Sequence, residues 1–268
     1  MHEGTTITGA VARTMPALFL AHGSPFLLDD AAWVRELARW ARALPRPAGV
    51  LILSAHWEQK PVTLGAITPV PLVHDFYGFP ARYYDIRYPA PGAPALASRL
   101  RQLLSPGQPI VEEPTRGLDH GAYVPLLAMY PQADVPVLQI SLPSLDPIAL
   151  FELGRALAPL RDEGVLIVGS GFLTHNLRAA DFGLDAVTPA WAMEFDAWAA
   201  EALAKQDVDA MLDYRRLAPG VRIALPTHEH FVPALAALGS AVERTGSVRF
   251  PIVGFAYGSM TKRSVQFG

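Results

Sequence analysis

Histidines placed after apolar segments are the residues in this sequence best suited to chemistry. Three of the eight histidines, His22, His56 and His175, come directly or shortly after a short apolar run that has the length of a β-strand. The carboxyl ends of the strands in an open parallel sheet meet at one crevice, where ligands bind. Neutral imidazoles gathered at such a crevice would form a site for a divalent metal. Because the chain has no cysteine, the ligands would have to be histidine or carboxylate side chains.

Four more histidines lie in segments rich in turn residues. They occur in the pairs His74-Asp75 and Asp119-His120 and in the segment Thr227-His228-Glu229-His230. A neighbouring carboxylate could fix the tautomer of an imidazole or raise its basicity. His228 and His230 are two positions apart, so on a helix only one of them could face a common metal. A single histidine of this kind is more often a hydrogen-bonded structural residue.

The elements that would position these side chains alternate along the chain. Strands are predicted at Ala17–Ala21, Val50–Ala55, Val62–Ile67, Pro109–Val111, Val135–Ser141, Val165–Gly169 and Val248–Tyr257. Helices are predicted with Asp30, Asp146 and Thr188 as N-caps, the last two followed by Pro147 and Pro189 at the first helical position, and a further helix is predicted from near Glu229. Apolar strands that alternate with helices favour an α/β fold, with a mainly parallel sheet covered by helices on both faces.

The composition excludes several classes of protein. A hydrophobic fraction of 51% with 18% charged residues excludes a disordered chain. The apolar runs are far shorter than the roughly 20 residues of a membrane-spanning helix. With 22 basic and 25 acidic residues and no basic stripe, nucleic acid is not an expected partner. No HExxH or GxGxxG motif is present. Residues 1–14 are predicted to be a flexible leader without a signal-peptide pattern, and the protein to be cytoplasmic.

The segment from Thr68 to Gly92 interrupts the alternation of strands and helices. It contains five prolines and four tyrosines. Long loops within compact domains are usually lids or binding loops, although an irregular surface segment is the simpler interpretation. Its tyrosine-rich part, from Phe76 to Tyr88, could stack on an aromatic ligand and exclude water.

Six short motifs occur in order over most of the chain. They are His22-Gly23-Ser24-Pro25, Ser54-Ala55-His56-Trp57, His74 to Pro80, Leu118-Asp119-His120-Gly121, Gly169-Ser170-Gly171 with Thr174-His175-Asn176, and Pro226 to Phe231. Together they resemble the DOPA-dioxygenase-type class III extradiol ring-cleavage dioxygenases, from about Pro16 to about Tyr257. The resemblance implies a single α/β catalytic domain, residues 15–268, around a central mixed, mainly parallel sheet flanked by helices on both faces.

The resemblance also implies a set of functional residues. His22, His56 and His230 would bind a mononuclear metal, which would be Fe(II) in the catalytic form, with Zn(II) as an ion that could be bound instead. His175 would be a fourth ligand or an acid–base residue, and His120 would be the second catalytic histidine. The residues expected to bind a substituted, DOPA-like catechol are His74, Asp75, Tyr77, Arg82 and His228. Relatives often carry histidine where this chain has Leu225, which concerns substrate choice and none of the ligands.

The chemistry of an extradiol enzyme suits these residue types. A catechol must lose protons to chelate a metal, and imidazole titrates in the range that such a base requires. Arg82 and Arg87 could pair with a carboxylate of the substrate. The expected partners are a small aromatic substrate and O2, and the sequence does not indicate an oligomeric state. Two alternatives use the same histidines: a zinc-dependent hydrolase that activates water, and a metal-dependent binder of small molecules without turnover.

Overall fold

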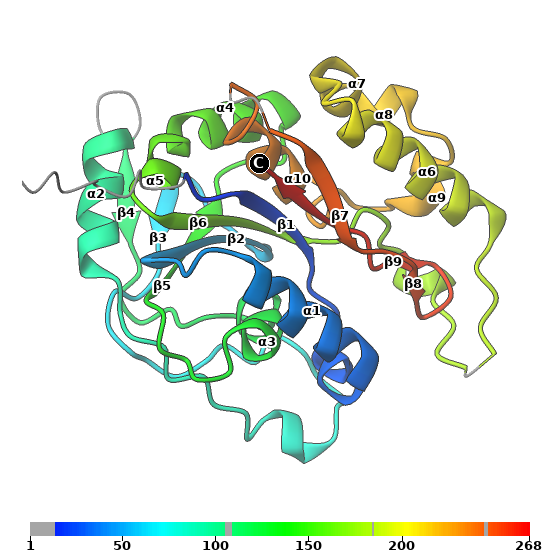
Figure 1. Ribbon diagram of the computed structural model, residues 1–268. Helices are drawn as coiled ribbons and strands as arrows, with labels where there is room; N and C mark the ends of the chain where they lie inside the picture. The colour runs from blue at the N-terminus through cyan, green and yellow to red at the C-terminus, as the bar shows by residue number, and fades with distance from the viewer. Residues whose placement is uncertain (1–13, 105–108, 184, 244–245) are drawn as a thin grey trace, which may run out of the picture.

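An eight-stranded mixed sheet runs through the protein (Figure 1). The computed structural model describes residues 14–104, 109–183, 185–243 and 246–268. The strand order is β4-β3-β5-β2-β6-β1-β10-β7. Strands β5, β2, β6 and β1 are mutually parallel, as are β3 and β4, whereas β3–β5, β1–β10 and β10–β7 are antiparallel. The bounds are β1 Ala17–Ala21, β2 Gly49–Glu58, β3 Val62–Leu64, β4 Ile110–Glu112, β5 Val137–Leu142, β6 Val165–Gly171, β7 Val248–Ile252 and β10 Ser264–Phe267.

Helices cover both faces of the sheet, which confirms the predicted fold class (Figure 1). Side chains alternate between the faces along each strand, so Leu18 and Leu20 of β1 enter one hydrophobic cluster and Ala17 and Phe19 the other. The first cluster is covered by α1 (Ala31–Ala43) and α3 (His120–Met129). The second is covered by α2 (Pro94–Leu104), α4 (Pro147–Leu157), α6 (Ala190–Ala204) and α10 (Pro233–Gly239).

Short elements complete the chain. The short α-helices are α5 (Pro159–Asp162), α7 (Val208–Leu212), α8 (Tyr214–Leu217) and α9 (Val221–Ala224). The described 3-10 helices are η1 (Pro25–Asp29), η2 (Ala81–Tyr83) and η3 (Leu177–Ala179). Strands β8 (Phe255–Ala256) and β9 (Met260–Thr261) form a separate hairpin. Within the described part of the chain, the helices are all too short or too polar to cross a bilayer.

The predicted elements agree with the structure except at a few boundaries. Asp30 and Asp146 cap α1 and α4 as predicted. The prediction that Thr188 caps the next helix is wrong, because Pro189 occupies the N-cap position of α6. The strand predicted at Val248–Tyr257 is divided into β7 and β8, and β10 was not predicted. Residues 1–13 of the predicted leader lie outside the described residues, and the single catalytic domain over residues 15–268 stays a prediction.

Candidate metal centre and active site

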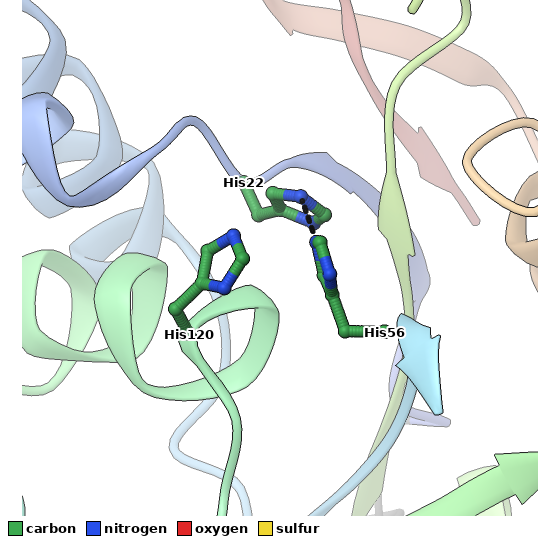
Figure 2. A group of neighbouring side chains, drawn as sticks. All are labelled: His22, His56 and His120. Carbon is green, nitrogen blue, oxygen red and sulfur yellow. Dashed lines mark hydrogen bonds between the residues drawn. The ribbon is translucent and has the colours of Figure 1, made fainter. Parts of the chain in front are cut away.

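Five imidazole rings meet at the carboxyl edge of the parallel strands. His22 follows β1, His56 lies near the end of β2, and His175 follows β6. The His22 ring centroid is 4.9 Å from that of His56, 5.5 Å from that of His120 and 5.4 Å from that of His230. Figure 2 shows the rings of His22, His56 and His120 pointing toward one another, with His120 at the start of a helix. The fold therefore gathers histidines that are up to 208 residues apart, His22 and His230, at one point.

Two glycines in β6 allow His230 to approach the sheet. A Cβ atom on Gly171 would lie 1.9 Å from the carbonyl oxygen of His230, and one on Gly169 would lie 2.1 Å from that of Pro233. The backbone N–H of Phe172 donates a hydrogen bond to the His230 carbonyl at 2.8 Å. The prediction that a helix begins near Glu229 is wrong: α10 begins at Pro233, and the backbone before it turns toward β6.

His120 is positioned by a helix start that the sequence did not predict. Asp119 is the N-cap of α3, and its side chain accepts a hydrogen bond from the Ala122 N–H at 3.2 Å. His120 is thus the first helical residue, where the sequence suggested a loop. The next residue has to be glycine, because a Cβ atom on Gly121 would lie 2.4 Å from Ser54 Oγ and 3.1 Å from His22 Nδ1.

Hydrogen bonds at Nδ1 fix the tautomers of the clustered imidazoles. Ser170 Oγ donates to the Gly121 carbonyl, so it must accept the proton of His22 Nδ1, which lies 2.9 Å away. Asp75 accepts from His120 Nδ1 at 2.7 Å and lies 3.3 Å from His56 Nδ1. Glu229 accepts from His230 Nδ1 at 2.9 Å. In His22, His120 and His230 the proton therefore lies on Nδ1 and the lone pair of Nε2 is free, and the contact with Asp75 favours the same tautomer in His56.

The Nε2 atoms of two of these rings face each other, an arrangement that fits a cation site. The Nε2 atoms of His22 and His56 are 3.1 Å apart. Burial, followed by the charges of the neighbouring histidines, holds the pKa of His22 well below its ordinary value, and burial lowers the pKa of His56 to about 3. Both rings are neutral near pH 7, and His22 holds its proton on Nδ1, so the two Nε2 atoms share at most one proton, which a bound cation would displace. Two nitrogens bound to one ion at about 2.1 Å would be separated by roughly this distance, so the donor set fits a divalent metal.

The potential ligand atoms form two groups. His22, His56 and His120 make one group, and His175, Glu229 and His230 make the other, each with its ligand atoms within 4.8 Å of one another. This grouping places His120 beside His22 and His56, where the family resemblance implies His230. The rings of His175 and His230 are stacked, with centroids 3.5 Å apart and an angle of 12° between their planes. Burial lowers the pKa of His175 to about 4.

Asp75 belongs to the loop at residues 68–92 and contacts the histidine cluster. Adjacency in the sequence did not reveal this contact. Asp75 binds His120 rather than its neighbour His74, while Asp119 caps a helix instead of binding His120. The Asp75 side chain is 20% exposed. Burial would raise its pKa, but the hydrogen bond from His120 and the His120 and His56 charges outweigh burial, so the pKa lies below its ordinary value.

For the ring opening that the family resemblance implies, we expect Asp75→Asn to lower kcat/KM by about 10- to 100-fold. The amide offers one acceptor where the carboxylate offers two, so either His120 or His56 loses its orientation. Steady-state oxygen uptake would measure this. Asp85→Asn is the matched control, since it removes an exposed carboxylate from the same loop. Equal activity of Asp75→Asn and the control would contradict the orienting role of Asp75.

A cavity of about 410 Å³ opens over the histidines. It lies within the size range of small-molecule sites. Its walls are mostly apolar, and the lining residues are His22, Gly23, Ser24, Pro25, Phe26, His56, Asp75, Phe76, Tyr77, Phe79, His120, Phe172, His175, Leu177, Phe182, His230, Tyr257 and Met260. Part of the wall comes from the loop at residues 68–92, as expected for a binding loop. From the sequence, no role at the site was predicted for Ser170, Glu229, Phe182 or Tyr257.

The other predicted substrate residues lie in different surroundings. Tyr77 lines the cavity and is 92% exposed. Arg82 donates a hydrogen bond to Asp29 at 2.8 Å, and His74 packs near Phe76. Neither Arg82 nor His74 is among the residues that line the cavity. His228 packs against Tyr214, outside the lining. Leu225, where relatives often carry histidine, is buried in the core.

Comparisons with known proteins identify the family of this chain. Residues 16–268 match the family described as the catalytic LigB subunit of aromatic ring-opening dioxygenase. A protein of Escherichia coli (strain K12) named 4,5-DOPA dioxygenase extradiol is 40% identical, over 95% of each chain. One of the same name from Beta vulgaris is 41% identical, over 85% of this chain and 87% of its own. The crystal structure of an uncharacterized protein from Escherichia coli K12 has a TM-score of 0.81 at 36% identity, covering 95% of this chain and 100% of that one. The chain belongs to this LigB family and is a class III extradiol, ring-opening dioxygenase.

Proposed function

We propose that this enzyme opens the ring of a substituted catechol with O2 at a mononuclear Fe(II) held by His22, His56 and His230. The observation that carries the proposal is the pair of facing Nε2 atoms of His22 and His56, beneath a cavity with aromatic walls. His230 has the same protonation pattern, with its Nδ1 bound by Glu229 and its Nε2 free. The metal, when bound, would hold catechol and O2 side by side and relay electron density between them.

His120 is proposed as the acid–base residue. Its Nδ1 is held by Asp75, so Nε2 has the free lone pair, and the ring lines the cavity. It would accept a proton from a catechol hydroxyl, and the Asp75 carboxylate would stabilise the resulting imidazolium. The same Nε2–H would later return the proton to an oxygen of the reacting substrate. Asp75 accepts from both the N–H and the Nδ1 of His120, which fixes the ring for both steps.

His175 is proposed to act on substrate rather than as a fourth ligand. The lone pair of an imidazole nitrogen lies in the ring plane, so a bound ion lies close to that plane. The planes of His175 and His230 are almost parallel and their centroids are 3.5 Å apart. One ion cannot lie in both planes, and therefore His230 as a ligand leaves His175 free beside it. With its pKa lowered by burial, His175 is neutral and can accept a proton or a hydrogen bond.

The aromatic wall would hold the substrate ring and exclude water. Phe76 and Phe79 pack edge to face with centroids 5.0 Å apart, and Phe79 lies 4.7 Å from Phe26. These side chains come from the loop at residues 68–92 and from η1. Tyr77, beside them and largely exposed, is proposed to cover the bound substrate. Low water content in the cavity would strengthen the interactions of the charged catecholate.

The test is reconstitution of metal-free protein. Protein loaded anaerobically with Fe(II) should consume one O2 per catechol and give a yellow ring-opened product, and the same protein loaded with Zn(II) should give neither. An oxygen electrode and the absorbance spectrum would measure both. Fe(II)-loaded protein that binds catechols without consuming O2 would refute the proposal.

A further inference from the structure

The cavity contains one pair of hydroxyl groups beyond the histidine cluster. Ser24 Oγ and Tyr257 Oη are 3.1 Å apart, and both residues line the cavity. Ser24 lies two residues after the proposed ligand His22, and Tyr257 comes from the β8–β9 hairpin. Phe26, Leu177, Phe182 and Met260 supply apolar surface to the same cavity. This part of the wall could receive the substituent of a catechol whose ring oxygens face the histidines.

The backbone holds Tyr257 in an uncommon conformation that places its ring in the cavity wall. Its φ is 53°, in the left-handed region that side chains with a Cβ atom rarely adopt, and Gly258 follows with φ 73°. Non-glycine residues in this region are concentrated at ligand sites. The Tyr257 ring lies 4.8 Å from the Phe182 ring, while its hydroxyl meets Ser24. These two contacts fix the ring with its polar end inside an apolar wall.

The hydroxyl pair has hydrogen-bonding capacity left over. Ser24 Oγ already accepts a bond from the Phe26 N–H at 3.3 Å. Of the two hydroxyl protons, one is used between Ser24 and Tyr257, so the other is free to donate. One of the two oxygens also keeps a free lone pair. The pair can therefore donate one hydrogen bond and accept another, which is the pattern that an alcohol group complements.

The charges around the pair do not suit a carboxylate. Among the described residues that line the cavity there is no lysine or arginine, and the acidic one, Asp75, is bound by two histidines. Arg82, the predicted partner of a substrate carboxylate, is instead bound to Asp29. Burial raises the pKa of Tyr257, and the Asp30 and Asp29 carboxylates contribute in the same direction. A carboxylate placed here would lose water without gaining a cationic partner.

We propose that the preferred substrate is a catechol with an uncharged substituent that ends in a hydroxyl group, which the Ser24–Tyr257 pair binds. This rests on the proposed catechol cleavage and differs from the amino-acid substrate in the names of the relatives. Affinity for the tail would come from the apolar wall and from two neutral hydrogen bonds. A catechol with an anionic or zwitterionic tail would bind less well because of the uncompensated carboxylate.

The first test compares catechols that differ only in the tail. Fe(II)-loaded enzyme would be assayed with 4-(2-hydroxyethyl)catechol, 4-ethylcatechol, 3,4-dihydroxyphenylacetate, dopamine and L-DOPA. The hydroxyethyl compound should have the highest kcat/KM, about tenfold or more above the carboxylate. A higher value for the carboxylate, for dopamine or for L-DOPA would overturn the proposal.

The second test removes one hydroxyl. Tyr257→Phe should reduce the ratio of kcat/KM for the hydroxyethyl compound over that for 4-ethylcatechol by about 3- to 10-fold, as expected for a neutral hydrogen bond. Tyr130→Phe, which deletes a buried hydroxyl away from this cavity, should leave the ratio unchanged. An unchanged ratio in Tyr257→Phe would overturn the assignment of the pair.

Calorimetric binding to Zn(II)-loaded protein separates this inference from the proposed function. If no catechol is cleaved by the Fe(II) form, catechol cleavage is refuted. The order of dissociation constants still tests the pocket. Tightest binding of the hydroxyethyl compound, weakened by Tyr257→Phe, would support the assignment, and any other order would overturn it.

Discussion

His120→Gln enzyme is expected to bind its metal normally and to open catechol rings about 10²- to 10⁴-fold more slowly, the usual effect of losing an acid–base residue. Glutamine can still donate to Asp75, so the surroundings of the side chain are kept. It has no nitrogen that takes up a proton near neutral pH, and deprotonation of the catechol would then depend on water. Single-turnover kinetics with saturating substrate, together with metal analysis, would measure the two effects separately.

His230→Gln is the informative comparison for this variant. His120 and His230 both lie beside His22, and the ligand atoms of His120 group with those of His22 and His56. We expect the His230 variant to lose metal and the His120 variant to keep it. The reverse result would assign His120 as the third ligand and contradict the proposed division of roles. Normal turnover in His120→Gln would leave His120 as a packing residue.

The family assignment decides between functions that the histidines alone left open. A cluster of neutral imidazoles would equally suit a zinc hydrolase or a binding protein, because each needs only a metal with an open position. The match over residues 16–268 and the two relatives of 40% and 41% identity identify an extradiol dioxygenase. The metal, the substrate and the role of each residue stay proposals.

The sequence predicted well what depends on local pattern. His22 and His56 could be placed because each follows an apolar run, and apolar runs of this kind become the inner strands of a parallel sheet. β10 was missed because Ser264–Phe267 alternates polar and apolar residues and contains no apolar run like those that marked the other strands. The turn before α10 was missed because the approach of His230 depends on Gly169 and Gly171, which are distant in sequence.

The partner of His120 could not be predicted from neighbours in the chain. His74-Asp75 and Asp119-His120 suggested two local pairs, but the fold brings Asp75 to His120, 45 residues away. Val73 and Asp119 form an isolated parallel bridge, which aligns the two segments and makes this exchange possible. Such long-range pairing depends on the tertiary structure, whereas the tendency of Asp119 to cap a helix is local and overrides its adjacency to His120.

Replacement of a ligand should have the largest effect on the metal. His22→Ala, His56→Ala and His230→Ala should each lower metal affinity by more than about 100-fold, because the loss of an outer-shell partner alone costs 10- to 100-fold and a ligand contributes more. Each substitution also removes one contact of the side chain that orients the ring, which is Ser170, Asp75 or Glu229. Metal per chain after reconstitution and dialysis, measured by mass spectrometry, would test this, with activity lost in parallel.

A measurement of stability distinguishes ligands from structural histidines. If the rings only fill the core, the three variants would unfold at lower temperature, and added metal would not change the difference from the parent protein. If the rings are ligands, metal should raise the melting temperature of the parent protein and should do so much less in the variants, because binding to the folded state alone stabilises it. His175→Gln should respond to metal as the parent does, since the stacked arrangement excludes it from the ion bound by His230. Full metal occupancy in all three alanine variants would refute the ligand set.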